Sequence, residues 1–454
     1  MVENETKKPV PIGAAREDEY DEEMQWSIFE AVQVTLEATW LVILAVGMNL
    51  WEAGKNTKIP VPMMVALGVL FAAVCIINDT FGIIGYSLDF HPNPNRPDEC
   101  FPAPVAGAWP LDSANRLRNA SHRFNTPAPG PESLAWDSQG RIYTGVADGR
   151  VIRWSEKDRK WETFATASPY WSPELCGFEH RGKNYPALEY VCGRPLGLKF
   201  DASDSLYIAD SYFGLSVVGP EGGVARILCG HSEGKLHQFT NDLDIDNDAR
   251  VVYFTVSSLR TQRKRCNLVV QEGDETGRII KYEIGTGRTT VIEKDIFYPN
   301  GIALSADKSF LLVVSTTTNR IQKLWLTGEK AGESEIFAKL PGYGDNVRAT
   351  EDGRFFWVAL HNRRTTLHHY LCQWDWFHRL VTPLALMSKR VEKLVAGPAT
   401  PIVIKYDMNG EAVEVLEDIT GKSPANFISS AVERQGTLWL SSIYLPAIYT
   451  YELQ

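Results

Sequence analysis

Four polar residues stand just before short apolar stretches of the sequence, and their side chains suit a metal ion. They are Glu132, Asn241, Asn300 and Asp345, and Asn346 directly follows the last of them. Two carboxylates and two or three amide oxygens form a set of hard ligands, which fits Ca²⁺ better than Zn²⁺, a metal that prefers His and Cys. Asn and Asp also cap turns where strands begin. Four such residues at corresponding positions of separate units favour the metal.

The stretches behind these residues share one pattern: an apolar strand, a turn rich in Asp and Gly, and a strand of β-branched or aromatic residues. In the clearest copy, Asn300 precedes expected strands at residues 302–304, 310–315 and 321–326. The pattern occurs six times at irregular spacing, and the copies begin at Gly130, Gly193, Phe239, Tyr298, Gly342 and Phe427.

Six copies of such a unit predict an all-β fold, a six-bladed β-propeller over residues 130–454, because one small sheet cannot bury both of its faces alone. An ordinary β-sandwich is the alternative. In a propeller the first strand of each blade lines the central channel. The leading polar residues are therefore expected to converge at one end of the axis.

Length and composition narrow the class of protein. A chain of 454 residues can bury a large core. Its formal net charge is −10, which argues against a nucleic-acid-binding protein, since these usually carry a basic face. Seven Cys are too few for a disulfide scaffold.

The N-terminal part predicts a membrane attachment. Residues 1–25 read as a polar, acidic tail, and residues 26–88 as a helical hairpin associated with a membrane. Residues 59–77 carry no charge and are long enough to span as a helix. Residues 27–51 are interrupted by Glu30 and Glu37, so an interfacial or buried amphipathic helix stays open there.

The charges around this hairpin give an orientation. Lys55 and Lys58 lie in the loop between the two apolar segments, and the positive-inside rule places that loop in the cytosol. The propeller is then expected on the lumenal or extracellular side of a plasma, endomembrane or other organellar membrane, where membrane lipid would be one partner. Asn119 begins a glycosylation sequon, which is compatible with that side.

Two further segments are expected outside the repeats. Residues 89–129 are rich in Pro, Asn and Arg and read as a linker. Residues 363–400 form an insertion in the fifth unit, with apolar and aromatic residues beside basic ones. The insertion could cover the channel mouth or touch the membrane, or it could be a partly buried lid without a binding role.

Residues 130–454 resemble the strictosidine synthase-like family, which includes the adipocyte plasma membrane-associated protein group. The resemblance is carried by six segments: residues 193–197 (Gly-Arg-Pro-Leu-Gly), 208–214, 218–223, 239–244 (Phe-Thr-Asn-Asp-Leu-Asp), 253–255 and 298–301 (Tyr-Pro-Asn-Gly). The wider superfamily, with paraoxonases and gluconolactonase/regucalcin, consists of six-bladed calcium-binding propellers.

By this resemblance, Glu132, Asn300 and Asp345 match calcium ligands, and Asn241 matches a ligand or a substrate contact. The resemblance also implies a disulfide between Cys176 and Cys192, and hence an oxidising compartment.

The sequence departs from its relatives where they carry catalytic groups. The glutamate position of strictosidine synthase falls on Ser429 or Ser430, and a hydroxyl cannot replace a carboxylate in proton transfer. The histidine position of paraoxonases falls on Leu196. Two acids that relatives carry on the channel side are replaced by Val256 and Ser315. True strictosidine synthase chemistry is therefore not expected.

Two functions remain open. The first is a calcium-dependent hydrolase of a small ester or lactone, with Asn241 orienting the substrate and with no catalytic proton acceptor assigned; His231 and His237 are the nearest candidates, although loop histidines are usually surface residues. The second is a non-catalytic propeller that serves as an interaction platform or as an accessory subunit of a membrane-protein complex.

Overall fold

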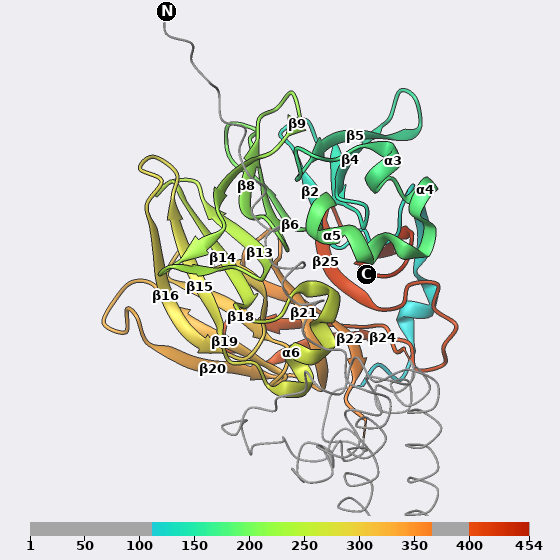
Figure 1. Ribbon diagram of the computed structural model, residues 1–454. Helices are drawn as coiled ribbons and strands as arrows, with labels where there is room; N and C mark the ends of the chain where they lie inside the picture. The colour runs from blue at the N-terminus through green and yellow to red at the C-terminus, as the bar shows by residue number, and fades with distance from the viewer. Residues whose placement is uncertain (1–110, 366–398, 454) are drawn as a thin grey trace, which may run out of the picture. The chain divides into compact units, whose positions relative to one another are not determined.

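Six sheets stand side by side in a ring in the computed structural model, which describes residues 111–365 and 399–453 (Figure 1). The first strand of each sheet lies innermost and contacts the first strand of at least one neighbouring sheet. The all-β six-bladed propeller expected from the repeats is therefore confirmed, and each of the six units corresponds to one blade.

The strands of the first three blades, from the inside out, are β2 (Leu134–Trp136), β3 (Ile142–Gly145), β4 (Arg150–Ser155) and β5 (Lys160–Thr166); β6 (Pro195–Phe200), β7 (Leu206–Asp210), β8 (Gly214–Val218) and β10 (Arg226–Cys229); and β13 (Phe239–Asp246), β14 (Val251–Ser258), β15 (Gly277–Glu283) and β16 (Thr289–Ile296). The short β9 (Gly223–Val224) adds to the first blade beside β5 in parallel.

The strands of the last three blades are β17 (Pro299–Leu304), β18 (Phe310–Ser315), β19 (Arg320–Trp325) and β20 (Ser334–Lys339); β21 (Gly342–Ala349), β22 (Phe355–Arg363), β23 (Ile402–Asp407) and β24 (Ala412–Glu417); and β25 (Ile428–Arg434), β26 (Thr437–Ser442), β27 (Ala447–Glu452) and β1 (Ser121–Asn125). In the fourth blade the expected strands are present, although β17 begins three residues before the expected 302 because its polar head also pairs with β18.

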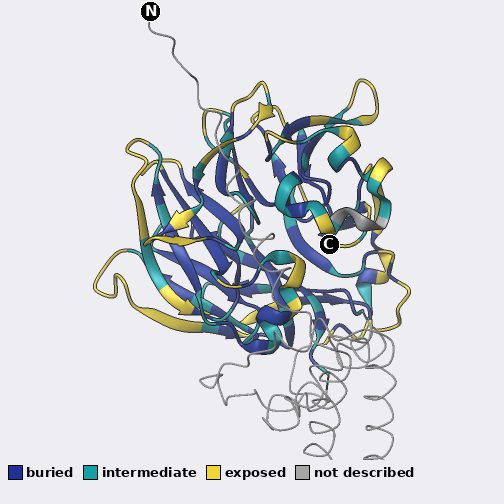
Figure 2. Cartoon of the chain, in the orientation of Figure 1, coloured by how far each residue is buried: buried dark blue, intermediate teal, exposed yellow. Residues whose placement is uncertain are grey.

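Both faces of the inner strands are buried because each blade packs against two neighbours. Six apolar clusters fill these contacts between blades, and one example joins Leu312 of β18 to Phe356 and Val358 of β22. Burial decreases toward the outer strands, as Figure 2 shows for β16, whose side chains are mostly exposed or half-buried. This radial layering explains why the inner strands read as continuous apolar runs.

The ring is closed by strand β1, which comes from the N-terminal end of the described residues. It pairs antiparallel with β27 and so becomes the outermost strand of the sixth blade. Phe124 of β1 packs against Trp154 and Trp161 of the first blade, with ring centroids 4.4 and 5.6 Å away. Residues 121–125 therefore belong to the propeller and not to the linker expected over residues 89–129.

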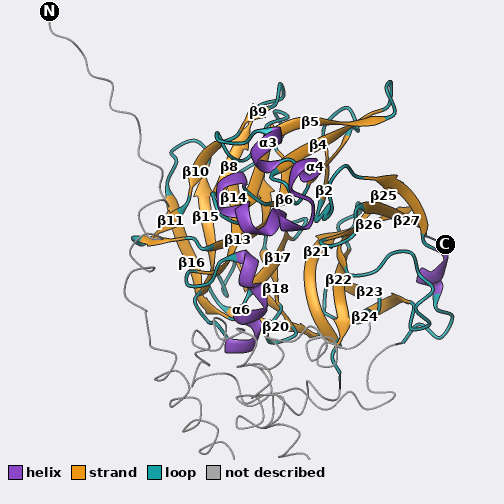
Figure 3. Ribbon diagram, turned by 45° about the vertical axis from the view of Figure 1, so that its right-hand side comes forward, coloured by secondary structure: helices purple, strands orange, loops and turns teal. Residues whose placement is uncertain are grey.

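Short helices follow some of the strands on one side of the blades. Figure 3 shows α3 (Pro173–Cys176), α4 (Phe178–Arg181) and α6 (Cys266–Glu272) in front of the sheets. Between α4 and the second blade lie η3 (Gly182–Leu188) and α5 (Glu189–Cys192), and η4 (Arg263–Arg265) leads into α6. A further 3₁₀ turn, η2 (Arg116–Asn119), precedes β1, and a small hairpin, β11 (His231–Ser232) with β12 (Lys235–Leu236), precedes β13.

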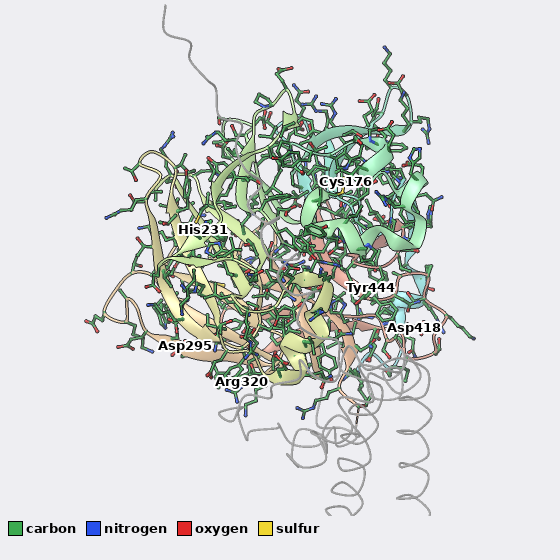
Figure 4. The ribbon with its side chains drawn as sticks, viewed as in Figure 1. Cys176, His231, Asp295, Arg320, Asp418 and Tyr444 are labelled. Carbon is green, nitrogen blue, oxygen red and sulfur yellow. A yellow bond between two sulfur atoms is a disulfide. The ribbon has the colours of Figure 1, made fainter. Side chains whose placement is uncertain are left out.

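The disulfide implied by the family resemblance is present. Cys176 at the end of α3 is bonded to Cys192 at the end of α5, 16 positions further along the chain (Cys176 is labelled in Figure 4). Cys229 and Cys266 are free thiols.

Removing this disulfide is expected to lower the free energy of unfolding by about 3 kcal/mol, because the bond restricts the unfolded chain over a loop of that length. Urea denaturation of the Cys176→Ser/Cys192→Ser double variant measures the loss. Adding a reductant should shift the wild-type midpoint and leave the midpoint of the double variant unchanged. An unchanged midpoint for wild type under full reduction would show that the bond contributes nothing.

Several expectations concern residues that lie outside the described ranges. The tail at residues 1–25, the hairpin at residues 26–88 and most of the insertion, residues 366–398, belong to this group. Within residues 111–365 and 399–453, no helix has both the length and the apolar character needed to cross a membrane. Asn119, the glycosylation candidate, is exposed at the end of η2.

Candidate functional site

The predicted ligand residues all lie at the heads of innermost strands, where the channel ends. Glu132 directly precedes the first blade's inner strand, Asn241 lies in β13, Asn300 in β17, and Asp345 and Asn346 lie in β21. All five side chains are buried. Hydrogen bonds connect these residues from one blade to the next.

Asn241 is held by a hydrogen-bond relay to the fourth blade. Its Nδ2 donates to Ser257 Oγ at 3.1 Å, and that hydroxyl donates to the backbone oxygen of Pro299 at 2.7 Å. The amide nitrogen therefore serves to fix the orientation of the Asn241 side chain. Its Oδ1 is buried without a hydrogen-bond partner.

Asn300 repeats this arrangement one blade further. Its Nδ2 donates to Thr316 Oγ1 at 3.1 Å, and Thr316 donates to the backbone oxygen of Gly344 at 2.7 Å. The Oδ1 of Asn300 again has no partner. Gly301 permits this close approach, because a Cβ there would lie 2.4 Å from the Cα of Asn346.

The chain of contacts ends at the first blade. Asn346 Nδ2 donates to Glu132 Oε1 at 2.5 Å, and this leaves Asn346 Oδ1 and Glu132 Oε2 without partners. Four buried oxygen atoms, from Glu132, Asn241, Asn300 and Asn346, are thus unsatisfied. Buried polar atoms are normally hydrogen-bonded, and such exceptions indicate a missing ion or water.

The charges around these oxygens are mostly negative. Glu132, Asp345 and Asp242 are buried carboxylates, and the guanidinium of Arg348 pairs with Asp242 through contacts of 2.5 and 2.9 Å. Burial, reinforced by the charges of Asp345 and Asp242, raises the pKa of Glu132 to about 8, while Arg348 and the bond from Asn346 oppose this rise. Without a cation, Glu132 therefore favours its protonated, neutral form, and a bound cation would favour the carboxylate.

One residue of the site was missed by sequence reasoning. His361, near the end of β22, places Nε2 2.8 Å from Asp345 Oδ2. A carboxylate only accepts hydrogen bonds, so Nε2 carries a proton, and in the neutral imidazole Nδ1 is then the acceptor. Nδ1 is buried without a partner. In the sequence, only its place near the end of a predicted strand, just before the insertion at residues 363–400, could have pointed to His361.

The two histidines proposed from the sequence lie elsewhere. His231 is exposed on the small hairpin β11–β12, and Figure 4 shows it well apart from Tyr444, whose ring centroid lies 6.4 Å from that of His361. His237 is buried; its Nε2 lies 2.9 Å from Ser232 Oγ. Burial, with the nearby charge of Arg278, lowers the pKa of His237 to about 3.

Ser429, Ser430 and Leu196 stand where relatives carry catalytic groups, and each has structural surroundings of its own. Ser429 donates to the backbone oxygen of Glu132 at 2.6 Å, and Ser430 is fully buried. Leu196 packs in an apolar cluster with Phe239 and Tyr298 beside the strand heads. None of these three positions carries a group that could transfer a proton.

The two positions at which relatives carry acids also have contacts of their own. Val256 packs in the apolar cluster between the second and third blades. Ser315 donates to the backbone oxygen of Phe297 at 2.5 Å. Both positions hold buried, uncharged side chains.

Breaking the Arg348–Asp242 pair is expected to destabilise the propeller strongly. In the Arg348→Met variant Asp242 would keep a buried, unpaired charge, which costs about 3–5 kcal/mol. The matched control is Arg354→Met, because Arg354 pairs with Asp352 at the surface and such pairs contribute about 0–1 kcal/mol. Urea denaturation measures both. Equal losses for the two variants would contradict the importance of the buried pair.

The side-chain types limit how an ion could be held. Among the described residues, no group of three or more His, Cys, Asp or Glu side chains is arranged to bind a metal. A cation at the strand heads would therefore need the amide oxygens of the Asn residues together with the carboxylates, which is a donor set of the kind that Ca²⁺ accepts.

Comparison with known proteins agrees with the resemblance noted in the sequence. A family model described as strictosidine synthase matches residues 241–329, and one described as strictosidine synthase-like, N-terminal, matches residues 112–154. Among solved structures, a gluconolactonase from Xanthomonas campestris has a TM-score of 0.49 at 17% identity and covers 75% of this chain and 92% of its own. A regucalcin from Agrobacterium tumefaciens has a TM-score of 0.48 at 14% identity and covers 74% and 93%.

The curated relatives are much more similar. Protein STRICTOSIDINE SYNTHASE-LIKE 10 of Arabidopsis thaliana is 44% identical over 331 residues, which cover 72% of this chain and 86% of the relative. The adipocyte plasma membrane-associated protein of Gallus gallus is 30% identical over 352 residues, which cover 76% and 80%. On these matches, the chain belongs to the strictosidine synthase-like family.

Proposed function

We propose that this propeller binds one Ca²⁺ ion at the strand heads and hydrolyses a small ester or lactone there. The observation that carries the proposal is the set of four buried oxygen atoms without hydrogen-bond partners, on Glu132, Asn241, Asn300 and Asn346. Together with Asp345 they offer the carboxylate and amide oxygens that Ca²⁺ prefers.

The electrostatics support a divalent cation. When all three carboxylates are ionised, they and the one guanidinium carry an excess of two negative charges, which a divalent cation would neutralise. When bound, Ca²⁺ would polarise a substrate carbonyl and stabilise the negative charge that develops on its oxygen. Glu132, Asn300, Asn346 and Asp345 would hold the ion, and Asn241 would hold the ion or orient the substrate.

The chain also supplies a group that can take up a proton. His361 is fixed by Asp345 in the tautomer that leaves Nδ1 as an acceptor. A water molecule at Nδ1 would give up its proton there as it attacks the carbonyl. Hydrolysis of this kind differs from strictosidine synthase chemistry, because Ser429 and Ser430 stand where that enzyme has its glutamate.

The same serines favour a second candidate function. Their hydroxyls, with Leu196, occupy the positions at which relatives carry proton-transferring groups, so the propeller could instead be a non-catalytic platform for a membrane-protein partner. In that case a bound Ca²⁺ would brace the heads of the inner strands. Activity of any kind in the purified chain separates the two functions.

We further place the propeller on the lumenal or extracellular face of a membrane. The disulfide Cys176–Cys192 supports an oxidising compartment, and Asn119 is exposed as a glycosylated residue must be. The membrane attachment itself rests on the apolar segments at residues 27–51 and 59–77. The printed name of the Gallus gallus relative associates that protein with the plasma membrane.

Assays of the purified chain against a panel of esters and lactones test the proposal. Activity is expected with Ca²⁺ and is expected to be lost after chelation. The His361→Asn variant should lower kcat by about 10²–10⁴-fold, because a positioned acid–base group contributes this much. The exposed His122→Asn is the matched control. No chelator-sensitive turnover across the panel would exclude the hydrolase and leave the platform function.

A further inference from the structure

The segment between β5 and β6 is closed into a loop by the disulfide between Cys176 and Cys192, which fixes the end of the short helix α5. Glu189, the first residue of this helix, is completely buried. Burying a carboxylate is costly unless it is paired and hydrogen-bonded. The partners of Glu189 therefore show which part of the fold the loop is attached to.

Two residues from other parts of the chain bind the carboxylate of Glu189. Arg263 of η4 places Nη1 2.8 and 3.0 Å from the two carboxylate oxygens, and Tyr212 donates its hydroxyl to Oε2 at 2.8 Å. The hydroxyl oxygen of Tyr212 in turn accepts the backbone N–H of Lys264 at 3.1 Å. These bonds join α5 to η4, although Glu189 and Arg263 lie 74 positions apart in the sequence.

Helix α6, which follows η4 directly, extends this connection to the strand heads (α5 and α6 are labelled in Figure 1). Val269 of α6 is fully buried and packs in one apolar cluster with Phe239 and Tyr298. Each of these two rings stands two residues before a candidate ligand, Asn241 and Asn300 respectively. The packing of α6 therefore helps to fix the backbone just before two of the unsatisfied oxygens.

Tyr298 depends on this packing in particular. Its φ angle is 48°, in the left-handed region that a bulky side chain rarely adopts. Such a backbone persists only where the surrounding structure holds it. Here the ring of Tyr298 is held between α6 and Phe239, whose ring centroid lies 5.5 Å away. A loosened α6 would therefore disturb Asn300, which follows two residues later.

We propose that the disulfide controls the calcium affinity of the strand heads by holding α5, and through it η4 and α6, in place. This inference rests on the calcium site proposed above. A dithiol reductant would break the bond between the two sulfur atoms, give each of them one electron and one proton, and itself close to a disulfide. Once released, α5 would move away and Glu189 would exchange Arg263 for water. With that anchor lost, α6 would hold the amide oxygens of Asn241 and Asn300 less firmly.

Hydrogen–deuterium exchange of the purified full-length chain tests the connection to α6 without any calcium. In the Cys176→Ser/Cys192→Ser and Glu189→Gln variants, the backbone amides of α6 should exchange about tenfold faster or more, because a hydrogen bond to a charged group contributes about that factor. The matched control is Glu162→Gln, since Glu162 pairs with Arg153 where both side chains are partly exposed. It should exchange as wild type does. Unchanged exchange of α6 in both test variants would overturn the proposal.

Calcium titration calorimetry, well below the melting temperature, then tests the effect on the site. Reduction of wild type, and each of the two test variants, should weaken calcium binding about fivefold or more, as is usual for coupled sites. The reductant should not change the Cys176→Ser/Cys192→Ser variant any further. Unchanged calcium affinity despite faster exchange of α6 would overturn the proposal and leave the calcium site intact. Absence of calcium binding in the oxidised wild type would overturn the calcium site itself, and this inference with it.

Discussion

Calcium is expected to raise the melting temperature of the purified chain much more at pH 8 than at pH 5.5, and the Glu132→Gln variant is expected to lose this difference. The cause is the raised pKa of Glu132, which burial and two neighbouring carboxylates bring to about 8 from an ordinary value of 4.5. Between these two values the folded, ion-free chain keeps a proton on Glu132 that the unfolded chain has released.

The direction of the effect follows from this difference in bound protons. Because the folded state binds more protons than the unfolded state, the ion-free propeller loses stability as the pH rises from about 4.5 to 8, by up to roughly 1.4 kcal/mol per pH unit. A bound Ca²⁺ replaces that proton. Its affinity, and with it the stabilisation at a fixed Ca²⁺ concentration, should therefore rise with pH over the same window.

Differential scanning calorimetry with and without Ca²⁺ at several pH values measures this effect. Glu132→Gln removes the titrating group but keeps the size of the side chain. Glu156→Gln, in the exposed turn after β4, is the matched control and should behave as wild type does. A calcium-induced shift that is the same at all pH values, or that survives in Glu132→Gln, would contradict the placement of the ion at Glu132.

Removing strand β1 is expected to have the largest effect on folding. A chain that begins at residue 126 would lack Phe124, whose burial against Trp154 and Trp161 is worth about 3–5 kcal/mol by itself. It would also expose the edge of β27, and an unpaired edge strand promotes aggregation. The total loss approaches the whole stability of a typical domain, about 5–15 kcal/mol.

A chain that begins at residue 111 is the control, since it keeps β1 and all described N-terminal residues. It should unfold cooperatively, while the chain that begins at residue 126 should be insoluble or unfold without a cooperative transition. In the full-length chain, Phe124→Ala should cost about 3–5 kcal/mol, and the exposed His122→Ala only about 0.5 kcal/mol. Equal stability of the two shortened chains would show that β1 does not close the ring.

The sequence predicted the inner part of the propeller well for a physical reason. Inner strands such as β18 are buried on both faces, so they read as continuous apolar runs between clear turn residues. Strand β1 escaped prediction because only Phe124 of its five residues is buried and because it lies in a stretch rich in Pro and Asn. Its pairing depends on the far end of the chain, which local patterns do not report.

In the candidate site, too, local sequence patterns reveal some residues, whereas others depend on contacts between strands or blades. The sequence could place Glu132, Asn241, Asn300 and Asp345 at the strand heads because each one precedes or opens a repeated strand. Ser257 and Thr316, which orient the two amides, could not be identified, because their partners lie in the next blade. His361 required the register of β22 against β21, which brings it to Asp345.

The most direct test of the central claim is a count of bound calcium. Titration calorimetry on the chelator-treated, full-length chain should show one Ca²⁺ ion per chain, and the Glu132→Gln/Asp345→Asn double variant should show none at the same concentrations. Absence of saturable binding in wild type, or equal binding by the double variant, would contradict a calcium site at the heads of the inner strands.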